Sequence, residues 1–339
     1  MPEPKFLVVR LGSLGDIVHT FPAVAGLRAT FSSAKIVWLT HPRWKELVAA
    51  AGLADEIWEI DTRSFSSVRG TLRNIRKERF TVAIDYQGLW KSAAIPFLAR
   101  ISRRIGFAPG SARESGAAVL YSERVKATAG HVADKNGQLS LAAGASLPTA
   151  EYMLTVPEDT KVKVAGFLRD NAIDKYAVLS PGGGWVSKCW PAERFGELAQ
   201  RLFREFGLPS MINIGPGEEE IAAKVVAVAG ARARAAIPYG GSFAELMAIL
   251  QRAECVVAGD TGPLHLADAL GTRVVAIIGP TDPARNGPYS GMRGGKKAIV
   301  LRAGDVESTY KREDEPHPSL LKISVDDVVG AMRSLQVVA

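Results

Sequence analysis

Short apolar runs alternate with longer amphipathic segments along the whole chain. Runs rich in β-branched residues cover 6–9, 35–40, 56–61 and 81–85 in the first half, and 176–180, 211–215, 255–259, 273–279 and 298–302 in the second. Near-continuous apolar strands that alternate with helices are typical of parallel sheets covered on both faces. The pattern therefore predicts an α/β protein with two doubly wound halves.

Helix boundaries are marked best in the second half. Pro191 suits the first helical position of a helix whose apolar face includes Phe195, and Gly207 suits its left-handed end. Ser324 is expected to cap a last helix, with acidic residues in its first turn. The polar segment 156–175 is expected to be the interdomain linker.

Length and composition fit this organisation. The chain has 339 residues, 47% of them hydrophobic and 23% charged, which suits two globular domains and excludes a disordered or collagen-like chain. Cys189 and Cys255 are far apart in the sequence, so neither a disulfide framework nor a zinc site is expected. No signal-peptide pattern and no apolar run long enough to span a bilayer is present, so we expect a cytoplasmic protein.

Positive charge is concentrated in the first half of the chain. Residues 1–150 hold 20 Lys and Arg against 12 Asp and Glu, whereas residues 151–339 hold 22 against 23. Ten basic residues lie between Arg63 and Arg104. They indicate either an anionic partner or a solvated helical face. Nucleic acid is not the expected partner, because aromatic residues are only 7% of the chain and no known binding module is present.

The first apolar run leads into a glycine-containing loop over 10–16. Gly12 and Gly15 do not complete a dinucleotide-binding GxGxxG pattern, but a glycine turn between a strand and a helix still lets a ligand approach the backbone. Asp16 at the end of this loop has two interpretations. It is either a partner of the helix dipole or a general base that takes a proton from an attacking hydroxyl.

Two glycine-rich loops follow strands of the second half. In the segment 181–191, three glycines precede Lys188, without the ending of a Walker A loop. Lys188 is a surface lysine or, as we favour, a phosphate ligand. In the segment 215–220, Gly-Pro-Gly precedes three glutamates, of which one is expected to bind ribose hydroxyls and the others to begin a helix.

The segment 258–268 combines several candidate ligands. A strand, then Asp-Thr-Gly-Pro, then a helix presents backbone donors suited to a diphosphate. Asp260 would repel a phosphate, so we expect it to orient the loop or a sugar hydroxyl. His265 is either a buried structural histidine or a donor to a phosphate oxygen.

Together these segments resemble the glycosyltransferase family that contains the ADP-heptose:lipopolysaccharide heptosyltransferases. The resemblance is carried by RLGSLGDIVHTFPAV at 10–24, DYQGLWKSA at 85–93, SKCWP at 187–191, GDTGPLHLADALG at 259–271 and GPTDP at 279–283. The runs at 15–22 and 279–283 favour the heptosyltransferase I branch. The resemblance implies a GT-B fold, with two Rossmann-like domains whose parallel sheets face a central cleft. It implies an acceptor domain over 1–160, a nucleotide-sugar domain over 175–319, and a final helix within 320–339 that packs back on the first domain.

The resemblance also implies roles for individual residues. Asp16 matches the family's base, and no metal ion or cofactor is expected. The donor and its phosphates are expected to contact Ser187, Lys188, Glu218, Asp260, Thr261, Gly262 and His265, with Glu219 as the alternative to Glu218. The acceptor is expected to contact Gly15, Arg63, Gln87 and Lys91.

The function implied is an inverting, metal-independent transfer of heptose from ADP-L-glycero-D-manno-heptose to the Kdo region of lipid A. The enzyme would act as a peripheral protein at the cytoplasmic face of the inner membrane. Three alternatives remain open from the sequence: a related transferase with another core acceptor or nucleotide sugar, a GT-B sugar-nucleotide 2-epimerase, and a non-catalytic nucleotide-sensing module.

Overall fold

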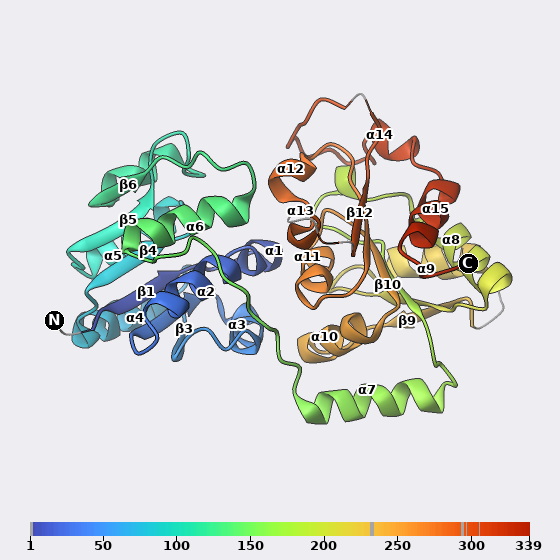
Figure 1. The fold of residues 1–339 in the computed structure, drawn as a ribbon, viewed down its shortest axis with the longest axis horizontal. Coiled ribbons are helices and arrows are strands. Elements are labelled where there is room, and N and C mark those ends of the chain that lie inside the picture. The colour runs from blue at the N-terminus through green and yellow to red at the C-terminus, as the bar shows by residue number, and fades with distance from the viewer. Residues whose placement is uncertain (1–2, 231–233, 293–294, 296, 305) are drawn as a thin grey trace. The chain divides into compact units, whose positions relative to one another are not determined.

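The computed structural model describes residues 3–230, 234–292, 295, 297–304 and 306–339. The chain divides into two compact units, Met1–Thr155 and Val156–Ala339. Each unit is built on one six-stranded sheet whose paired strands are all parallel (Figure 1). The predicted α/β class with two doubly wound halves is confirmed.

The first unit has the strand order β3-β2-β1-β4-β5-β6. Its strands are β1 (Lys5–Val9), β2 (Lys35–Thr40), β3 (Glu56–Glu59), β4 (Val82–Asp85), β5 (Arg103–Phe107) and β6 (Glu123–Val125). Its helices are α1 (Leu14–Val18), α2 (Phe21–Thr30), α3 (Lys45–Ala50), α4 (Phe65–Glu78), α5 (Trp90–Leu98) and α6 (Val132–Ala143), with short 3-10 helices η1 (Pro42–Trp44) and η2 (Ser115–Leu120).

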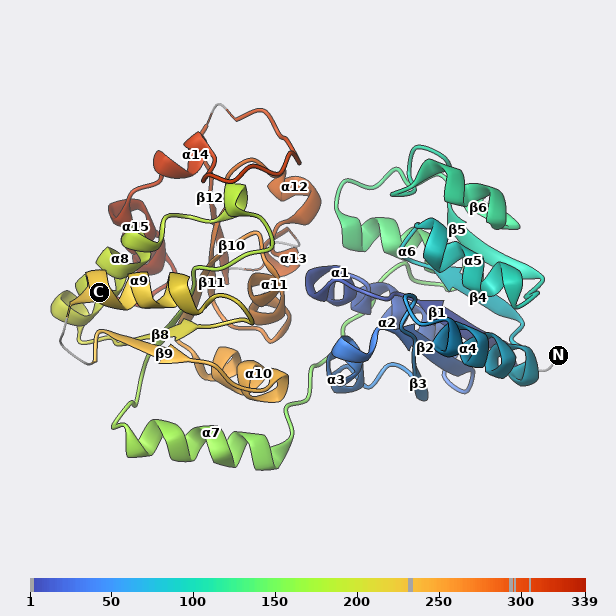
Figure 2. The same cartoon turned by 180° about the vertical axis from the view of Figure 1, so that it is seen from behind.

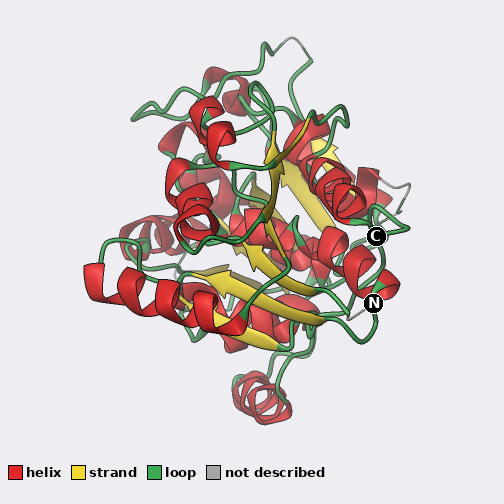
Figure 3. Cartoon of the chain, turned by 90° about the vertical axis from the view of Figure 1, so that its left-hand side faces the viewer, coloured by secondary structure: helices red, strands yellow, loops and turns green. Residues whose placement is uncertain are grey.

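Helices cover both faces of this first sheet (Figures 2 and 3). Alternate side chains of a strand point to opposite faces, so β1 contributes to two layers of core. Leu7 packs in one buried cluster with Ile75 of α4 and Ile95 of α5. On the other face, Phe21 of α2 packs against Trp38 of β2 with ring centroids 5.6 Å apart. The continuous apolar runs of the sequence thus reflect burial on both faces.

The second unit has the strand order β12-β11-β10-β7-β8-β9. Its strands are β7 (Ala177–Ser180), β8 (Ser210–Asn213), β9 (Ala236–Tyr239), β10 (Cys255–Gly259), β11 (Val274–Ile277) and β12 (Ala298–Leu301). Its helices are α7 (Glu158–Asp170), η3 (Val186–Lys188), α8 (Ala192–Phe206), α9 (Glu219–Ala229), α10 (Phe243–Arg252), α11 (Gly262–Ala269), α12 (Pro283–Asn286), α13 (Tyr289–Met292), α14 (Pro318–Leu321) and α15 (Val325–Ser334).

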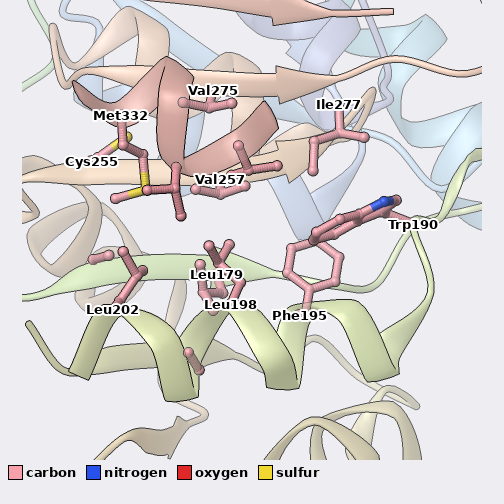
Figure 4. Close-up of a cluster of buried hydrophobic side chains, with 14 of the residues drawn as sticks. Leu179, Trp190, Phe195, Leu198, Leu202, Cys255, Val257, Val275, Ile277 and Met332 are labelled. Carbon is pink, nitrogen blue, oxygen red and sulfur yellow. The ribbon is translucent and has the colours of Figure 1, made fainter. Parts of the chain in front are cut away.

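Helix α8 shows how local signals and packing agree. Gly207 ends it with φ 63°, as its left-handed position requires. Pro191 is the N-cap rather than the first helical residue, so α8 begins one residue later than predicted. Its buried face presents Phe195 to the sheet beside Trp190, with ring centroids 5.0 Å apart and near-perpendicular planes (Figure 4).

The C-terminal helix packs on the second unit, and the expected return to the first domain is wrong. Val328 and Met332 of α15 lie in the same buried cluster as Val257 of β10 (Figure 4). The Trp190 indole N–H also donates to the carbonyl of Ile323, just before α15, at 3.0 Å. The apolar face of α15 is therefore already buried within its own unit.

Two other expectations need adjustment. The segment predicted as a linker contains the 13-residue helix α7, and the first unit ends at Thr155 rather than at 160. Strands β5, β6 and β9 were not predicted. Two arginines open β5, β6 has only three residues, and Pro238 interrupts the apolar pattern of β9.

Candidate functional site

The first unit joins two loops at the carboxyl edge of its sheet. The strand order reverses between β1 and β4, which pair in parallel and end at the same edge. Open α/β sheets bind ligands at such a reversal, outside the carboxyl ends of the strands. Arg10 follows β1, and its guanidinium donates to the carbonyl of Tyr86, which follows β4. The two loops therefore form one candidate site.

Asp16 lies in this site within α1, and four donors converge on its carboxylate. Arg10 Nη2 is 2.7 Å from Oδ1. The backbone N–H and hydroxyl of Ser13 donate to Oδ2 at 3.1 and 2.9 Å, and Arg113 Nη1 is 3.4 Å from the same oxygen. The Asp16 side chain is 24% exposed, whereas that of Arg10 is 4% exposed. A buried arginine is thus neutralised by a carboxylate that solvent can reach.

These neighbours set the protonation state of Asp16. Burial raises the pKa of its carboxyl, but the charges of Arg10 and Arg113 and the hydrogen bonds from Ser13 outweigh burial, so the pKa falls below its ordinary value. Burial lowers the pKa of the Arg10 guanidinium, and the charge of Asp16 opposes that change. Asp16 is therefore an anion at neutral pH. Its low pKa makes it a weak base for as long as both arginines hold it.

Asp85 supports the site from the interior. This carboxylate ends β4 and is 1% exposed. Its Oδ1 accepts the N–H groups of Gln87 and Gly88 at 2.8 and 3.3 Å, and its Oδ2 accepts the hydroxyls of Ser92 and Tyr121 at 2.7 Å each. Burial raises the pKa of Asp85 despite these hydrogen bonds. The network fixes the turn that follows β4.

Gln87 connects that turn to the loop after β1. Its side-chain oxygen accepts the Leu11 N–H at 2.7 Å, and the residue is buried. Gly88 has φ 68°, and a Cβ there would lie 3.2 Å from the backbone nitrogen of Arg113. The missing side chain lets the loop that carries Arg113 approach. In the structure Gln87 therefore connects the loop after β4 to the loop after β1. The expected contact between Gln87 and an acceptor stays a prediction.

The other predicted acceptor residues are spread along the edge. Gly15 adjoins Asp16 in α1, and Lys91 is exposed in the first turn of α5. Arg63 is exposed after β3, and β2 separates β3 from β1. The structure therefore groups Gly15 with Asp16, but it does not group Arg63 with them.

The basic stretch also divides into two sets. Arg103 pairs with Glu123 at 2.7 Å, and Arg104 donates to the carbonyls of Leu120 and Ile101. These two arginines have structural contacts. The exposed members are Arg63, Arg69, Arg73, Arg76, Lys77, Arg79, Lys91 and Arg100.

The second unit repeats the reversal of strand order, here between β7 and β10. The three glycines 182–184 follow β7, and Gly259 ends β10. A Cβ on Gly183 would lie 3.1 Å from Thr261 Cγ2, and one on Gly259 would lie 2.8 Å from the carbonyl oxygen of Lys188. The loops after the two strands can pack this closely because glycine occupies these positions.

Lys188, Asp260 and His265 form a largely buried polar cluster at this edge. Lys188 Nζ is 2.7 Å from Asp260 Oδ2, and His265 Nε2 is 3.2 Å from Asp260 Oδ1. Their side chains are 14%, 6% and 6% exposed. Burial raises the pKa of Asp260, but His265 and Lys188 outweigh burial and hold the pKa well below its ordinary value. A phosphate would therefore have to compete with Asp260 for the Lys188 ammonium.

The N-terminus of α11 lies beside this group. Thr261 is its N-cap and Gly262 its first residue, so the free backbone N–H groups of the first turn begin directly after Asp260. The Thr261 hydroxyl oxygen is buried and has no hydrogen-bond partner among the described residues. A helix N-terminus with free donors favours a negatively charged ligand.

Glu218 lies between the loops after β7 and β8. Its Oε2 accepts the Gly215 N–H at 2.8 Å, and a Cβ on Gly182 would come within 2.0 Å of its Oε1. Glu219 is instead exposed in the first turn of α9. Of the two glutamates left open by the sequence, Glu218 is the one held against the glycine loop.

Ser187 anchors a C-terminal segment. It is 1% exposed, its carbonyl accepts the His317 N–H at 3.3 Å, and its hydroxyl donates to the Lys311 carbonyl at 3.4 Å. These contacts fasten the segment 311–317 to η3. The expected contact between Ser187 and a donor stays a prediction.

That segment brings Arg312 to the same site. Its Cζ lies 4.9 Å from the centroid of the Trp185 ring, and Lys188 Nζ lies 4.2 Å from the same ring. Arg312 is exposed and makes no ion pair within the described part of the chain. A second positive charge thus lies less than 10 Å from Lys188.

Sequence reasoning gave no role to five residues of the two sites: Arg10, Asp85, Arg113, Trp185 and Arg312. Arg10 and Asp85 end apolar runs, and a polar residue at a strand end is a usable signal. Arg113 follows β5, which was not predicted. Arg312 is 125 residues from Ser187, and no local pattern connects them.

Among the residues that the structure describes, no three His, Cys, Asp or Glu side chains are grouped so that they could hold a metal ion. Nor does any helix in that part of the chain reach the length and apolarity needed to cross a bilayer.

Comparison with known proteins identifies the family of the chain. Residues 68–313 match the family model "Glycosyltransferase family 9 (heptosyltransferase)". The chain is 29% identical to lipopolysaccharide heptosyltransferase 1 of Pseudomonas aeruginosa, covering 84% of this chain and 81% of that protein. It is 26% identical to lipopolysaccharide heptosyltransferase 1 of Escherichia coli K12, over 98% of this chain and all of that protein.

The fold is likewise that of a known structure. E. coli heptosyltransferase WaaC, solved with ADP, superposes with a TM-score of 0.75 at 23% identity, covering 98% of this chain and 99% of that one. This match confirms the GT-B fold expected from the sequence. The family match extends over more than half of the chain and includes the segments around Asp85, Lys188 and Asp260. The chain therefore belongs to glycosyltransferase family 9, the heptosyltransferase family, and is a glycosyltransferase.

Proposed function

We propose that this enzyme transfers heptose from ADP-L-glycero-D-manno-heptose to the Kdo region of lipid A, with inversion and without a metal ion. Family membership supports heptose as the transferred sugar. Similarity to the two heptosyltransferase 1 proteins supports an acceptor of the lipopolysaccharide core. The observation that carries the proposal is Asp16, an ionised and partly exposed carboxylate at the strand reversal of the first sheet.

In this proposal Asp16 takes the proton of the acceptor hydroxyl as that oxygen attacks the anomeric carbon. Arg113 is 58% exposed and only 3.4 Å from Asp16. A carboxylate of the acceptor would pair with Arg113 and draw its charge away. The pKa of Asp16 would then rise, which makes it a stronger base when the acceptor is present. Arg10, which is buried, would keep the carboxylate in place.

The second unit would hold the donor and stabilise the leaving diphosphate. Backbone N–H groups after Thr261 would bind its phosphates, and Lys188 would move from Asp260 to a phosphate oxygen. Glu218 would accept hydrogen bonds from the ribose. Negative charge that develops on departing ADP would meet donors already in position, which lowers the barrier to transfer.

These groups can stabilise the diphosphate without a metal ion, so we expect transfer to continue in EDTA. The measurement is the initial rate with and without the chelator. Loss of activity in EDTA, with recovery on addition of Mg²⁺, would contradict the metal-independent mechanism.

The proposed acceptor also gives the enzyme a location. Kdo-lipid A is embedded in a bilayer, so the enzyme would meet it as a peripheral protein at the cytoplasmic face of the inner membrane. The exposed basic residues of the first unit suit the phosphates of that acceptor and surface.

The test is incubation of the purified protein with ADP-heptose and Kdo-lipid A, followed by mass spectrometry of the lipid. The expected product is the acceptor with one added heptose. If no such product forms at saturating donor, the proposed donor and acceptor are wrong, and a panel of nucleotide sugars and core acceptors would follow. Conversion of the sugar nucleotide without acceptor would instead identify an epimerase.

A further inference from the structure

Helix α5 exposes apolar side chains where a surface helix normally carries polar ones. Trp90 and Phe97 are seven residues apart and therefore lie on the same side of the helix. They are 48% and 45% exposed, and Leu98 beside Phe97 is 49% exposed. Val119 of η2, which packs against α5, is 61% exposed. We call these four residues the α5 face.

The α5 face is not a result of poor packing. The opposite side of the helix is buried through Ala93, Ile95 and Pro96, and Ile95 lies in the core under the sheet. Helix α5 is thus apolar both toward its own core and toward solvent. Several exposed apolar side chains on one helix and on the segment packed against it indicate a surface that binds a partner.

Positive charge borders this face. Arg76 of α4 donates to the Leu98 carbonyl at 2.8 Å, and the Arg104 guanidinium lies 5.5 Å from the centre of the Phe97 ring. Arg100 is exposed two residues beyond Leu98. Lys91 on α5 is exposed as well. The acidic residue that contacts this helix is Glu114, whose carboxylate accepts the backbone N–H of Trp90 at 2.6 Å. The border is therefore predominantly basic.

We infer that the α5 face is a docking surface for a bilayer that contains anionic phospholipids. Exposed aromatic and aliphatic side chains enter the interfacial region of a membrane, and arginine and lysine at their margin pair with lipid phosphates. A purely apolar partner would gain nothing from the basic border. A soluble polyanion would gain nothing from the four apolar side chains.

The position of α5 in the fold agrees with this role. The helix starts at Trp90, just after the Asp85 turn, at the carboxyl edge that holds Asp16. A membrane on the α5 face would lie next to the edge where the acceptor is proposed to react. The inference rests on the proposed lipid-linked acceptor, but its test is separable from transfer.

The experiment measures binding of the full chain to sedimenting vesicles of phosphatidylcholine with or without phosphatidylglycerol. We expect binding that requires phosphatidylglycerol. The double variant Phe97→Ser/Leu98→Ser should weaken it about tenfold or more, because both side chains lose their apolar contact with lipid. Arg76→Gln/Arg100→Gln should weaken it about 25-fold, since each basic residue near an anionic surface contributes about fivefold.

Matched controls come from elsewhere in the same unit. Leu147→Ser removes an apolar side chain of 51% exposure near α2, on the opposite face of the sheet, and Arg124→Gln removes an exposed charge on β6. Both controls should bind vesicles like the wild type. Thermal unfolding of every variant separates loss of binding from loss of fold.

Three results would overturn the inference: no binding of the wild type to anionic vesicles, equal binding to pure phosphatidylcholine, or unchanged binding of both α5-face variants. Self-association that Phe97→Ser/Leu98→Ser abolishes, without vesicle binding, would assign the face to a second copy of the chain.

A second assay, heptose transfer to a deacylated and soluble Kdo acceptor, distinguishes the docking surface from the proposed function. The variant Phe97→Ser/Leu98→Ser should keep this transfer activity. A wild-type protein that binds vesicles but transfers no heptose would contradict only the proposed function.

Discussion

Replacing Asp16 by Asn tests whether its charge has two separate functions, in stability and in catalysis. Asn preserves the size of the side chain but removes the charge that neutralises Arg10. Because Arg10 is 4% exposed, its guanidinium would remain buried and would lose its ion-pair partner. Breaking a buried ion pair in this way costs about 3–5 kcal/mol, and we expect about 3 kcal/mol because Asp16 itself is 24% exposed.

The two effects can be measured independently. For a unit of this size, about 3 kcal/mol lowers the Tm by about 6–12 °C, which thermal unfolding of the purified variant would show. Loss of a general base lowers kcat by about 10²–10⁴-fold, measured with saturating donor and acceptor at a temperature where the variant is folded. ADP affinity should not change, because the donor loops belong to the second unit.

A second substitution separates the roles. Arg10→Met in the Asp16→Asn background removes the unpaired charge, so we expect about half of the lost stability to return. Recovery stays incomplete because the hydrogen bond from Arg10 to the Tyr86 carbonyl is also lost. Turnover should stay at the level of the single variant. The reasoning fails if Asp16→Asn leaves the Tm unchanged, or if either variant turns over at the wild-type rate.

Three further changes test the second unit. Lys188→Ala should raise the donor KM and lower kcat, because it removes a cation from the diphosphate site; unchanged kinetics would exclude Lys188 from that site. Gly182→Ala should weaken ADP binding in calorimetry, since its Cβ would occupy the position of the Glu218 carboxylate, whereas Gly184→Ala, with open space around it, should not. Ionised Asp260 should stabilise the folded protein at pH values above about 3.9, the pKa of an aspartate in the unfolded chain. This contribution to stability should be lost as the pH falls below about 4, toward the lower pKa that Asp260 has in the folded protein. Asp260→Asn should reduce this acid-dependent change in Tm, and an identical pH profile would contradict the assignment.

Strands whose side chains are buried on both faces of a sheet were predicted from the sequence. Strands such as β10, buried along its whole length, appear as continuous apolar runs and were found. Strand β5 begins with Arg103, whose guanidinium pairs with Glu123 on the neighbouring strand β6. A pattern based on polarity cannot distinguish this arrangement from a loop. The packing of α15 was also beyond the sequence, because an amphipathic helix does not specify which unit buries it.

The same distinction applies to the sites. Asp16 and Lys188 were predicted as site residues because each follows a strand and a glycine turn, so local sequence carries the signal; their roles in transfer stay predictions. Their partners are set by tertiary structure: Arg113 is 97 residues from Asp16, and Asp260 is 72 residues from Lys188. The residue types showed which groups could react, but their charge environment depended on distant segments.

Those environments share one physical feature. In the first unit Asp16 is neutralised by Arg10 and Arg113, and in the second Lys188 is neutralised by Asp260. Each ion pair holds Asp16 or Lys188 in place. A charged substrate group that binds one of these side chains must therefore displace the partner that already neutralises it. A ligand without the matching charge gains nothing from that exchange. In the proposed function, the pairs would therefore favour substrates that bring a carboxylate to one site and a diphosphate to the other. They would also link the reactivity of Asp16 to the arrival of the acceptor.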